Sequence, residues 1–263
     1  MTEFLILSLG VFLGSCVSGF AGFAFSATAG AVLLHFFEPI LVVPLMMLCS
    51  IASQSATLLM LRKSIQFRNT TWLLFGGLAG VPLAIYALTI IDPGAFKSAF
   101  GLFLVAYAAY LLIKPTSAAL QSLINPLAHT AVGFGGGLVG GLTAMPGAIP
   151  TMWCELRGAT KEQQRALVQP FILAMQIFAV LLLSLHPAGF HPDMVKDLLL
   201  VLPALAAGTW FGMALFHRMD PAVFRKCTLM LLLFSGLGMI GWQGLNDISA
   251  STAAPVKPLF AGS

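Results

Sequence analysis

The residues best suited to chemistry in this chain are hydroxyl side chains and glycines, gathered in two apolar stretches. Ser18, Ser26 and Thr28 lie in the first stretch, SGFAGFAFSATAG, and Thr143 and Pro146 lie in the second, GGLTAMPGAIP. Glycine lets a backbone bend or be approached closely, and proline removes a hydrogen-bond donor. Where a helix is interrupted, its N–H groups and positive dipole end attract anions, and hydroxyls add donors. The two stretches therefore predict an anion site without a full counter-charge.

Close helix packing is the other interpretation of these glycines, because small residues four apart let two helices approach. We expect Gly133 to Gly137 to serve packing, and the stretch from Gly140 to Pro150 to form a break paired with the stretch from Ser18 to Thr28. Small residues recur with this spacing at Gly10, Gly14, Ser18, Gly22, Ser26 and Gly30, and again at Gly133, Gly137 and Gly141.

Polar side chains on two other segments complete the candidate site. Buried polar residues of membrane helices point inward, where they either join helices or line a solute path. The candidate substrate-binding residues are Ser18, Gly19, Gly22, Ser26, Thr28, Ser50, Gln54, Gly140, Gly141, Thr143, Pro146, Gly147 and Gln176.

Catalytic chemistry has little support. No Asp, Glu, Lys or Arg lies deep in an apolar segment, which argues against proton pumps and intramembrane acid–base enzymes. His129 is the nearest base for a nucleophile such as Ser18 or Cys16. We expect no catalytic residue, metal site, cofactor or nucleic-acid partner. An intramembrane serine or cysteine enzyme and a non-transporting membrane scaffold remain the alternatives, and whether Cys16 or Cys154 faces a pathway stays open.

The composition defines the elements that must hold these residues. The chain has 263 residues, 59% of them apolar and 8% charged, whereas soluble domains have about 25% charged residues. We therefore predict an all-α integral membrane protein in the lipid bilayer. Eight apolar segments can be marked, at 4–36, 38–61, 70–91, 95–113, 125–156, 166–186, 195–217 and 221–243.

Two of these segments, 4–36 and 125–156, are too long for one straight crossing. A straight helix of 33 residues would reach about 50 Å, against a hydrocarbon core of about 30 Å. Both contain the glycine stretches. We predict that each breaks and re-enters, returning to the side on which it began.

The chain also repeats itself. The Asp92-Pro93 turn matches Asp220-Pro221, 128 residues later, and Gly80 matches Gly208 at the same offset. Pro44 corresponds to Pro170 and Ser50 to Gln176, while Gly14 and Gly19 correspond to Gly136 and Gly141. We predict two four-segment membrane repeats, 1–115 and 122–245, followed by a flexible tail, 246–263.

Loop charges favour an inverted repeat. If the long segments re-enter, ten of the thirteen Lys and Arg residues share one side, as the positive-inside rule requires. Corresponding loops of the two halves then differ in charge, as inversion predicts. We therefore place both termini outside the cell inner (cytoplasmic) membrane. The ten are Arg62, Lys63, Arg68, Lys114, Arg157, Lys161, Arg165, Arg218, Arg225 and Lys226.

Three of these basic residues follow the second glycine stretch directly. Arg157, Lys161 and Arg165 are spaced i, i+4, i+8, which predicts one helical side at the cytoplasmic mouth. They either set the topology alone or attract an anion into a vestibule.

The pattern as a whole resembles the sulfite exporter TauE/SafE family of membrane permeases. The matching motifs are Ser18-Gly19-Phe-Ala-Gly22, Gly140-Gly141-Leu-Thr143-x-x-Pro146 and the two Asp-Pro turns. The resemblance implies a permease for a small anion such as sulfite, thiosulfate or a sulfonate, and it is compatible with a homo-oligomer. The chain departs from the family at Gly22-Phe-Ala-Phe-Ser26, where the family has Gly-x-Gly-Gly-Gly, and at Ala144-Met145-Pro146, where it has Gly-Gly-Pro.

Overall fold

The computed structural model describes residues 2–21, 24–61, 67–113, 126–157, 159, 161–185 and 194–216, together with scattered positions between 223 and 241. This part of the chain is helical throughout and contains no strand, so the predicted all-α class is confirmed. Five of the helices in these described ranges are long and apolar enough to cross a membrane. The described helices are α1 (Thr2–Ala21), α2 (Phe25–Leu33), α3 (Pro39–Leu61), α4 (Phe67–Ile90), α5 (Pro93–Ile113), α6 (Pro126–Thr143), α7 (Ala148–Leu156), α8 (Lys161–Ser184) and α9 (Met194–Phe216).

Local sequence explains where several helices begin. Pro39, Pro93 and Pro126 each occupy the first position of a helix, where a missing N–H costs nothing and the fixed φ angle suits the helix. Before α5, the carboxylate of Asp92 accepts a hydrogen bond from the backbone N–H of Ala95 at 2.9 Å. This is the N-cap interaction that satisfies one otherwise unpaired donor. The first Asp-Pro pair is thus a helix start, while the second lies outside the described residues.

Each of the two long segments consists of a long helix followed by a nine-residue helix. In the first, a β-carbon on Gly10 would lie 2.7 Å from Leu33, and one on Gly14 would lie 2.9 Å from Ala29. These contacts show that α2 runs back along α1. In the second, a β-carbon on Gly135 would lie 3.0 Å from Ile149, so α7 likewise folds back on α6. We call these units the first hairpin (α1–α2) and the second hairpin (α6–α7).

An alanine in the left-handed conformation stands at the turn of each hairpin. Ala24 has φ 68° and Ala144 has φ 56°, and they are the two described non-glycine residues with positive φ. Left-handed backbone costs an L-residue about 1–2 kcal/mol. The surrounding packing must supply that energy.

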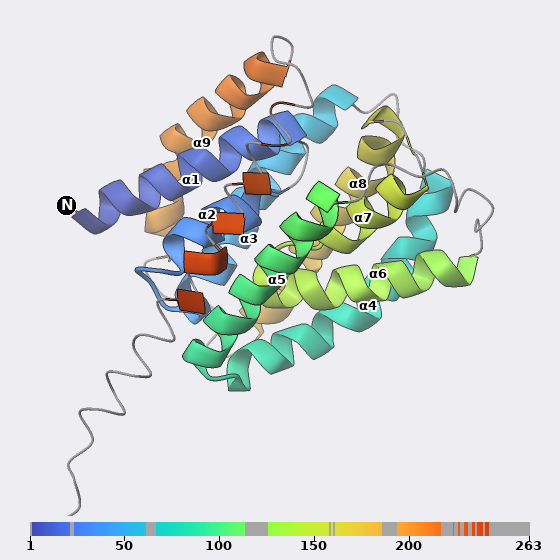
Figure 1. The fold of residues 1–263 in the computed structure, drawn as a ribbon, viewed down its shortest axis with the longest axis horizontal. Coiled ribbons are helices and arrows are strands. Elements are labelled where there is room, and N and C mark those ends of the chain that lie inside the picture. Colours follow the sequence, from blue (N-terminus) through green and yellow to red (C-terminus); the bar gives the residue numbers. More distant parts are fainter. Residues whose placement is uncertain are drawn as a thin grey trace, which may run out of the picture.

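The long arm of each hairpin packs on a helix from the other end of the chain. α1 lies along α9 and α4 lies along α6, forming two side-by-side pairs at different edges of the bundle (Figure 1). A β-carbon on Gly80 of α4 would collide with the Phe134 carbonyl of α6, and one on Gly208 of α9 would lie 2.5 Å from the Phe12 carbonyl of α1. Backbones can approach this closely only where side chains are absent.

A second contact between a glycine and a backbone carbonyl occurs within each of the two helix pairs. A β-carbon on Gly141 of α6 would lie 3.1 Å from the Val81 carbonyl of α4. One on Gly19 of α1 would lie 2.7 Å from the Thr209 carbonyl of α9. Gly133 and Gly137 also touch the backbone of α4, at Leu73 and Gly77, as expected of packing glycines. The same interlocking therefore occurs at both edges of the bundle.

The interior is built from the short helices and the helices between the two pairs. Eight of the nine residues of α2 are buried, and α2, α3, α7 and α8 contribute to one continuous apolar core. In contrast, α4 and α9 carry large exposed apolar side chains, among them Tyr86 and Trp210. An apolar surface of this kind is suited to lipid.

Candidate functional site

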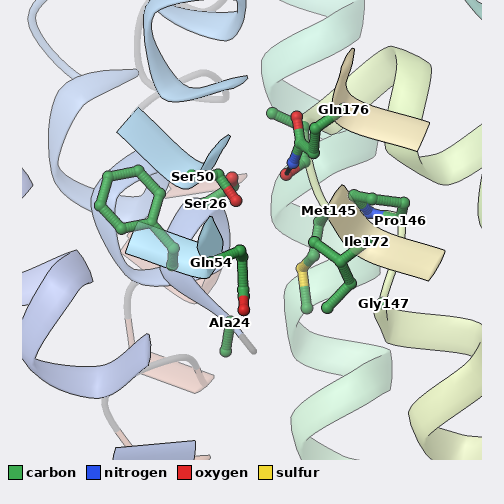
Figure 2. A pocket seen from close by; sticks show the side chains of 11 residues that line it. Ala24, Ser26, Ser50, Gln54, Met145, Pro146, Gly147, Ile172 and Gln176 are labelled. Carbon is green, nitrogen blue, oxygen red and sulfur yellow. Dashed lines mark hydrogen bonds between the residues drawn. The ribbon is translucent and has the colours of Figure 1, made fainter. Parts of the chain in front are cut away.

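A small polar pocket lies where the bends of the two hairpins approach each other. Its cavity has a volume of about 10 Å³, which is about the space that one water molecule needs. Residues from α2 and α3 face residues from the α6–α7 turn and α8 across it (Figure 2). The lining residues are Ala24, Phe25, Ser26, Ser50, Gln54, Ala144, Met145, Pro146, Gly147, Ile172 and Gln176.

Both short helices begin at this pocket. The first backbone bond of α2 runs from the Thr28 N–H to the Ala24 carbonyl at 3.1 Å. At the start of α7, the Ala148 N–H donates to the Met145 carbonyl at 3.3 Å and the Thr151 N–H donates to the Gly147 carbonyl at 2.9 Å. The other N–H groups at the start of each helix have no acceptor within that helix. The N-cap residue of α2, Ala24, provides no side-chain cap. Two helix N-termini, each with positive dipole character, thus flank the same space.

Side chains add hydrogen-bonding groups to the pocket. Ser26 is 2% exposed, and its hydroxyl has no hydrogen-bond partner in the part of the chain that the structure describes. The Gln176 amide nitrogen donates to the Ala144 carbonyl at 2.7 Å, which leaves its amide oxygen buried without a described partner. A buried polar group without a partner costs about 1–3 kcal/mol. Such groups indicate a place where a ligand or water completes the hydrogen bonding.

Six of the residues predicted for substrate binding line this pocket. They come from four different elements, so the fold brings together groups that are up to 150 positions apart in sequence. They are Ser26, Ser50, Gln54, Pro146, Gly147 and Gln176.

The other predicted site residues lie elsewhere. The Thr143 hydroxyl donates to the Val139 carbonyl of its own helix at 2.6 Å. Gly19 and Gly141 pack on the neighbouring helices, and a β-carbon on Gly140 would lie 2.5 Å from Pro146. Ser18 and Thr28 are buried outside the pocket lining, and Gly22 lies outside the described residues.

Five lining residues were not predicted from the sequence. Ala24, Phe25, Ala144, Met145 and Ile172 are apolar, and an apolar residue in an apolar segment carries no signal of its own. For the four residues other than Ile172, the departure of the sequence from the family motif was an available signal. Each of the four occupies a position where the resemblance to the family leads us to expect glycine.

The three basic residues expected on one helical side do not share a helix. α7 ends at Leu156, before Arg157, and α8 begins at Lys161, so the i, i+4, i+8 argument was wrong. Arg157 contacts His129 with 3.4 Å between Nη1 and Nε2. Arg165 instead donates to the Phe20 carbonyl of α1. The side chain of Lys161 lies outside the described residues.

The cysteines and possible metal ligands add nothing to the pocket lining. Cys16 is half-buried and its carbonyl touches Gly212 of α9, while Cys154 is buried in α7. Among the residues with described positions, no three His, Cys, Asp or Glu side chains gather in a way that could hold a metal ion.

These features define a helical membrane protein with a small polar pocket inside its bundle. The chain belongs to the sulfite exporter TauE/SafE family, whose model matches residues 6–239. Membership implies a membrane exporter of sulfite or a related anion. No curated protein and no solved structure matches the chain.

Proposed function

We propose that the protein is a permease that moves a small, sulfur-containing anion such as sulfite, thiosulfate or a sulfonate across the cytoplasmic membrane. The anion binds in the pocket between the two hairpin bends. One observation carries this proposal. Two helix N-termini and the Ser26 hydroxyl, which has no partner among the described residues, surround one space, and the described residues that line it include no charged side chain. No catalytic residue is needed.

Partial charges suit transport better than a full counter-charge. A buried Lys or Arg would hold an anion tightly, whereas several N–H and O–H donors bind it and still let it leave. Ser26, Ser50 and the Gln54 and Gln176 amides supply side-chain groups around the N–H groups of α2 and α7. The apolar side chains of Phe25, Met145 and Ile172 narrow the space, which favours a small anion or one with a small apolar part.

The paired contacts support an inverted repeat. With the sequence offsets of 128 and 122 residues, the Gly80–Phe134 contact corresponds to the Gly208–Phe12 contact. Ser50 and Gln176, which correspond at an offset of 126, both line the pocket. A pseudo-two-fold axis through the pocket would relate these pairs. These contacts and the loop charges support our proposal that both termini lie outside and that alternating access is an exchange of roles between the two halves.

A transport assay with a matched pair of variants tests the proposal. Proteoliposomes containing the protein are loaded with sulfite, thiosulfate, a sulfonate or a carboxylate, and efflux is measured with and without ion gradients. We expect efflux of at least one sulfur anion. Ser50→Leu, which fills the pocket, should lower it at least about tenfold. Ser55→Leu on the same helix, outside the pocket lining, should change it less than about twofold.

Two outcomes would contradict the proposal. The site would be wrong if folded Ser50→Leu protein transported at the wild-type rate. The substrate class would be wrong if only carboxylates moved.

A further inference from the structure

Three side chains come together at the open end of the second hairpin, away from the pocket at its bend. His129 lies near the start of α6, Trp153 lies in the last turn of α7 and Arg157 follows α7. The His129 and Trp153 rings meet edge to face at 6.2 Å between centroids. The Arg157 guanidinium carbon lies 5.7 Å from the Trp153 ring centroid, and Arg157 Nη1 lies 3.4 Å from His129 Nε2. We call these residues the hairpin-end cluster.

Two N–H donors of the hairpin-end cluster have no acceptor among the residues that the structure describes. Arg157 Nε and Trp153 Nε1 are both buried, and neither has a hydrogen-bond partner in the part of the chain that the structure describes. A guanidinium only donates, so Nε2 of His129 is the acceptor in its contact with Arg157. No described carboxylate pairs with Arg157. The four described acidic side chains, Glu3, Glu38, Asp92 and Asp197, belong to other elements.

Such an arrangement is unfavourable without an occupant. Arginine is almost never buried unless its charge is paired, and each unsatisfied buried donor costs about 1–3 kcal/mol, more when it is charged. An oxyanion would remove the penalty, because one tetrahedral or pyramidal anion offers three or four acceptor oxygens to several N–H donors at once. Arg157 as a whole residue is only partly buried.

We infer that the hairpin-end cluster is a second oxyanion-binding site, separate from the transport pocket. The guanidinium of Arg157 supplies the charge, and Arg157 Nε and Trp153 Nε1 supply two N–H donors that have no partner among the described residues. The occupant is a small multivalent oxyanion such as sulfate or sulfite. The proposal concerns binding only, and it stands whether or not the pocket transports the same anion.

Tryptophan fluorescence measures this binding directly. In a W72F/W210F/W242F background, Trp153 is the remaining tryptophan of the four in the chain. Purified protein is titrated with sodium sulfate or sodium sulfite, against sodium chloride at equal ionic strength. We expect a saturable change in Trp153 emission with the oxyanions and no saturable change with chloride. R157Q should weaken the apparent affinity at least about tenfold, and R157K should weaken it less because it keeps the charge.

Two more variants test whether the fluorescence response arises at the hairpin-end cluster. Q176L alters the pocket and should leave the Trp153 response within about twofold; loss of the response there would show that it reports the pocket, and would overturn the proposal. E155Q should also leave the response within about twofold. A marked tightening in E155Q would show that a carboxylate is the partner of Arg157, which likewise overturns the proposal.

A stability measurement covers the case in which R157Q folds poorly. Sulfate should raise the midpoint of thermal unfolding of the wild-type protein more than chloride does at equal ionic strength, and W153F should reduce that difference. An equal response to sulfate and chloride in the wild-type protein would overturn the proposal.

Discussion

The guanidinium of Arg165, at the start of α8, donates a hydrogen bond to the carbonyl oxygen of Phe20, in the last turn of α1. The last carbonyls of a helix lack partners within it, and a cation near them is favoured by the helix dipole. Phe20 comes four residues before Ala24, which lines the pocket. The bond therefore ties the second half of the chain to the bend of the first hairpin.

We predict that Arg165→Gln lowers the free energy of unfolding by about 1.5–3 kcal/mol, the usual contribution of a hydrogen bond that involves a charged group. Arg165→Lys should lose less, since an ammonium can still donate to the carbonyl. Anion efflux should fall several-fold in Arg165→Gln because the bend loses a support. Thermal unfolding in detergent and proteoliposome efflux check both effects. Lys196→Gln, which removes an exposed charge from α9, is the control. Equal behaviour of Arg165→Gln and Lys196→Gln would contradict the prediction.

We predict matched losses for Gly80→Ala and Gly208→Ala, because each glycine touches a backbone carbonyl at an equivalent place in the two helix pairs. Adding a methyl group to a tight contact costs about 1–3 kcal/mol. Gly241→Ala should be nearly neutral, since a β-carbon there would have nothing within 4 Å. Thermal unfolding of the three variants gives the comparison. A large loss in only one of the first two would contradict the equivalence of the pairs.

The sequence indicates that the two long segments are interrupted, but it does not indicate the residue at which each turn falls. Glycine clusters in over-long segments led us to expect breaks near residues 18–28 and 140–150. They also led us to assign Gly133 to Gly137 to packing, and Gly140 and Gly141 to the second break. α6 continues through Gly140 and Gly141 to Thr143, because those glycines are used to approach Pro146 and α4, and the turn falls at Ala144.

The site was only partly predictable for a similar reason. Ser26, Ser50, Gln54 and Gln176 stand out because polar residues are rare in apolar segments. Thr143 is equally conspicuous in the sequence. Its hydroxyl, however, donates to a carbonyl of its own helix, and residue spacing does not reveal such a local hydrogen bond. The contacts of Arg157 and Arg165 depend on where α7 ends and α8 begins, and element ends are poorly defined by composition.

We predict that Ala24→Gly and Ala144→Gly each raise the free energy of unfolding by about 1 kcal/mol. Both alanines have positive φ, which glycine adopts without strain. Ala108→Gly should do the opposite, losing about 1 kcal/mol, because Ala108 is buried within the regular helix α5. Chemical or thermal unfolding measures the sign. If all three substitutions lowered the free energy of unfolding by the same amount, this would contradict backbone strain at the two bends.

Gln176 gives the sharpest test of the pocket, because its amide holds the second bend while its oxygen stays available to a ligand. Gln176→Leu removes the donor to the Ala144 carbonyl, which should cost about 1–3 kcal/mol of stability and raise the KM for anion efflux. Gln176→Glu is nearly the same size, but its ionised form cannot donate and would repel an anion. We therefore expect a larger fall in efflux, at least about tenfold.

Gln169→Leu is the control for this prediction. Gln169 is as deeply buried on the same helix and does not line the pocket. Its replacement should reduce stability while leaving the KM close to that of the wild-type protein, because the loss is one of packing and hydrogen bonding alone. Equal KM values for Gln176→Leu, Gln169→Leu and the wild-type protein would mean that the anion binds elsewhere in the bundle.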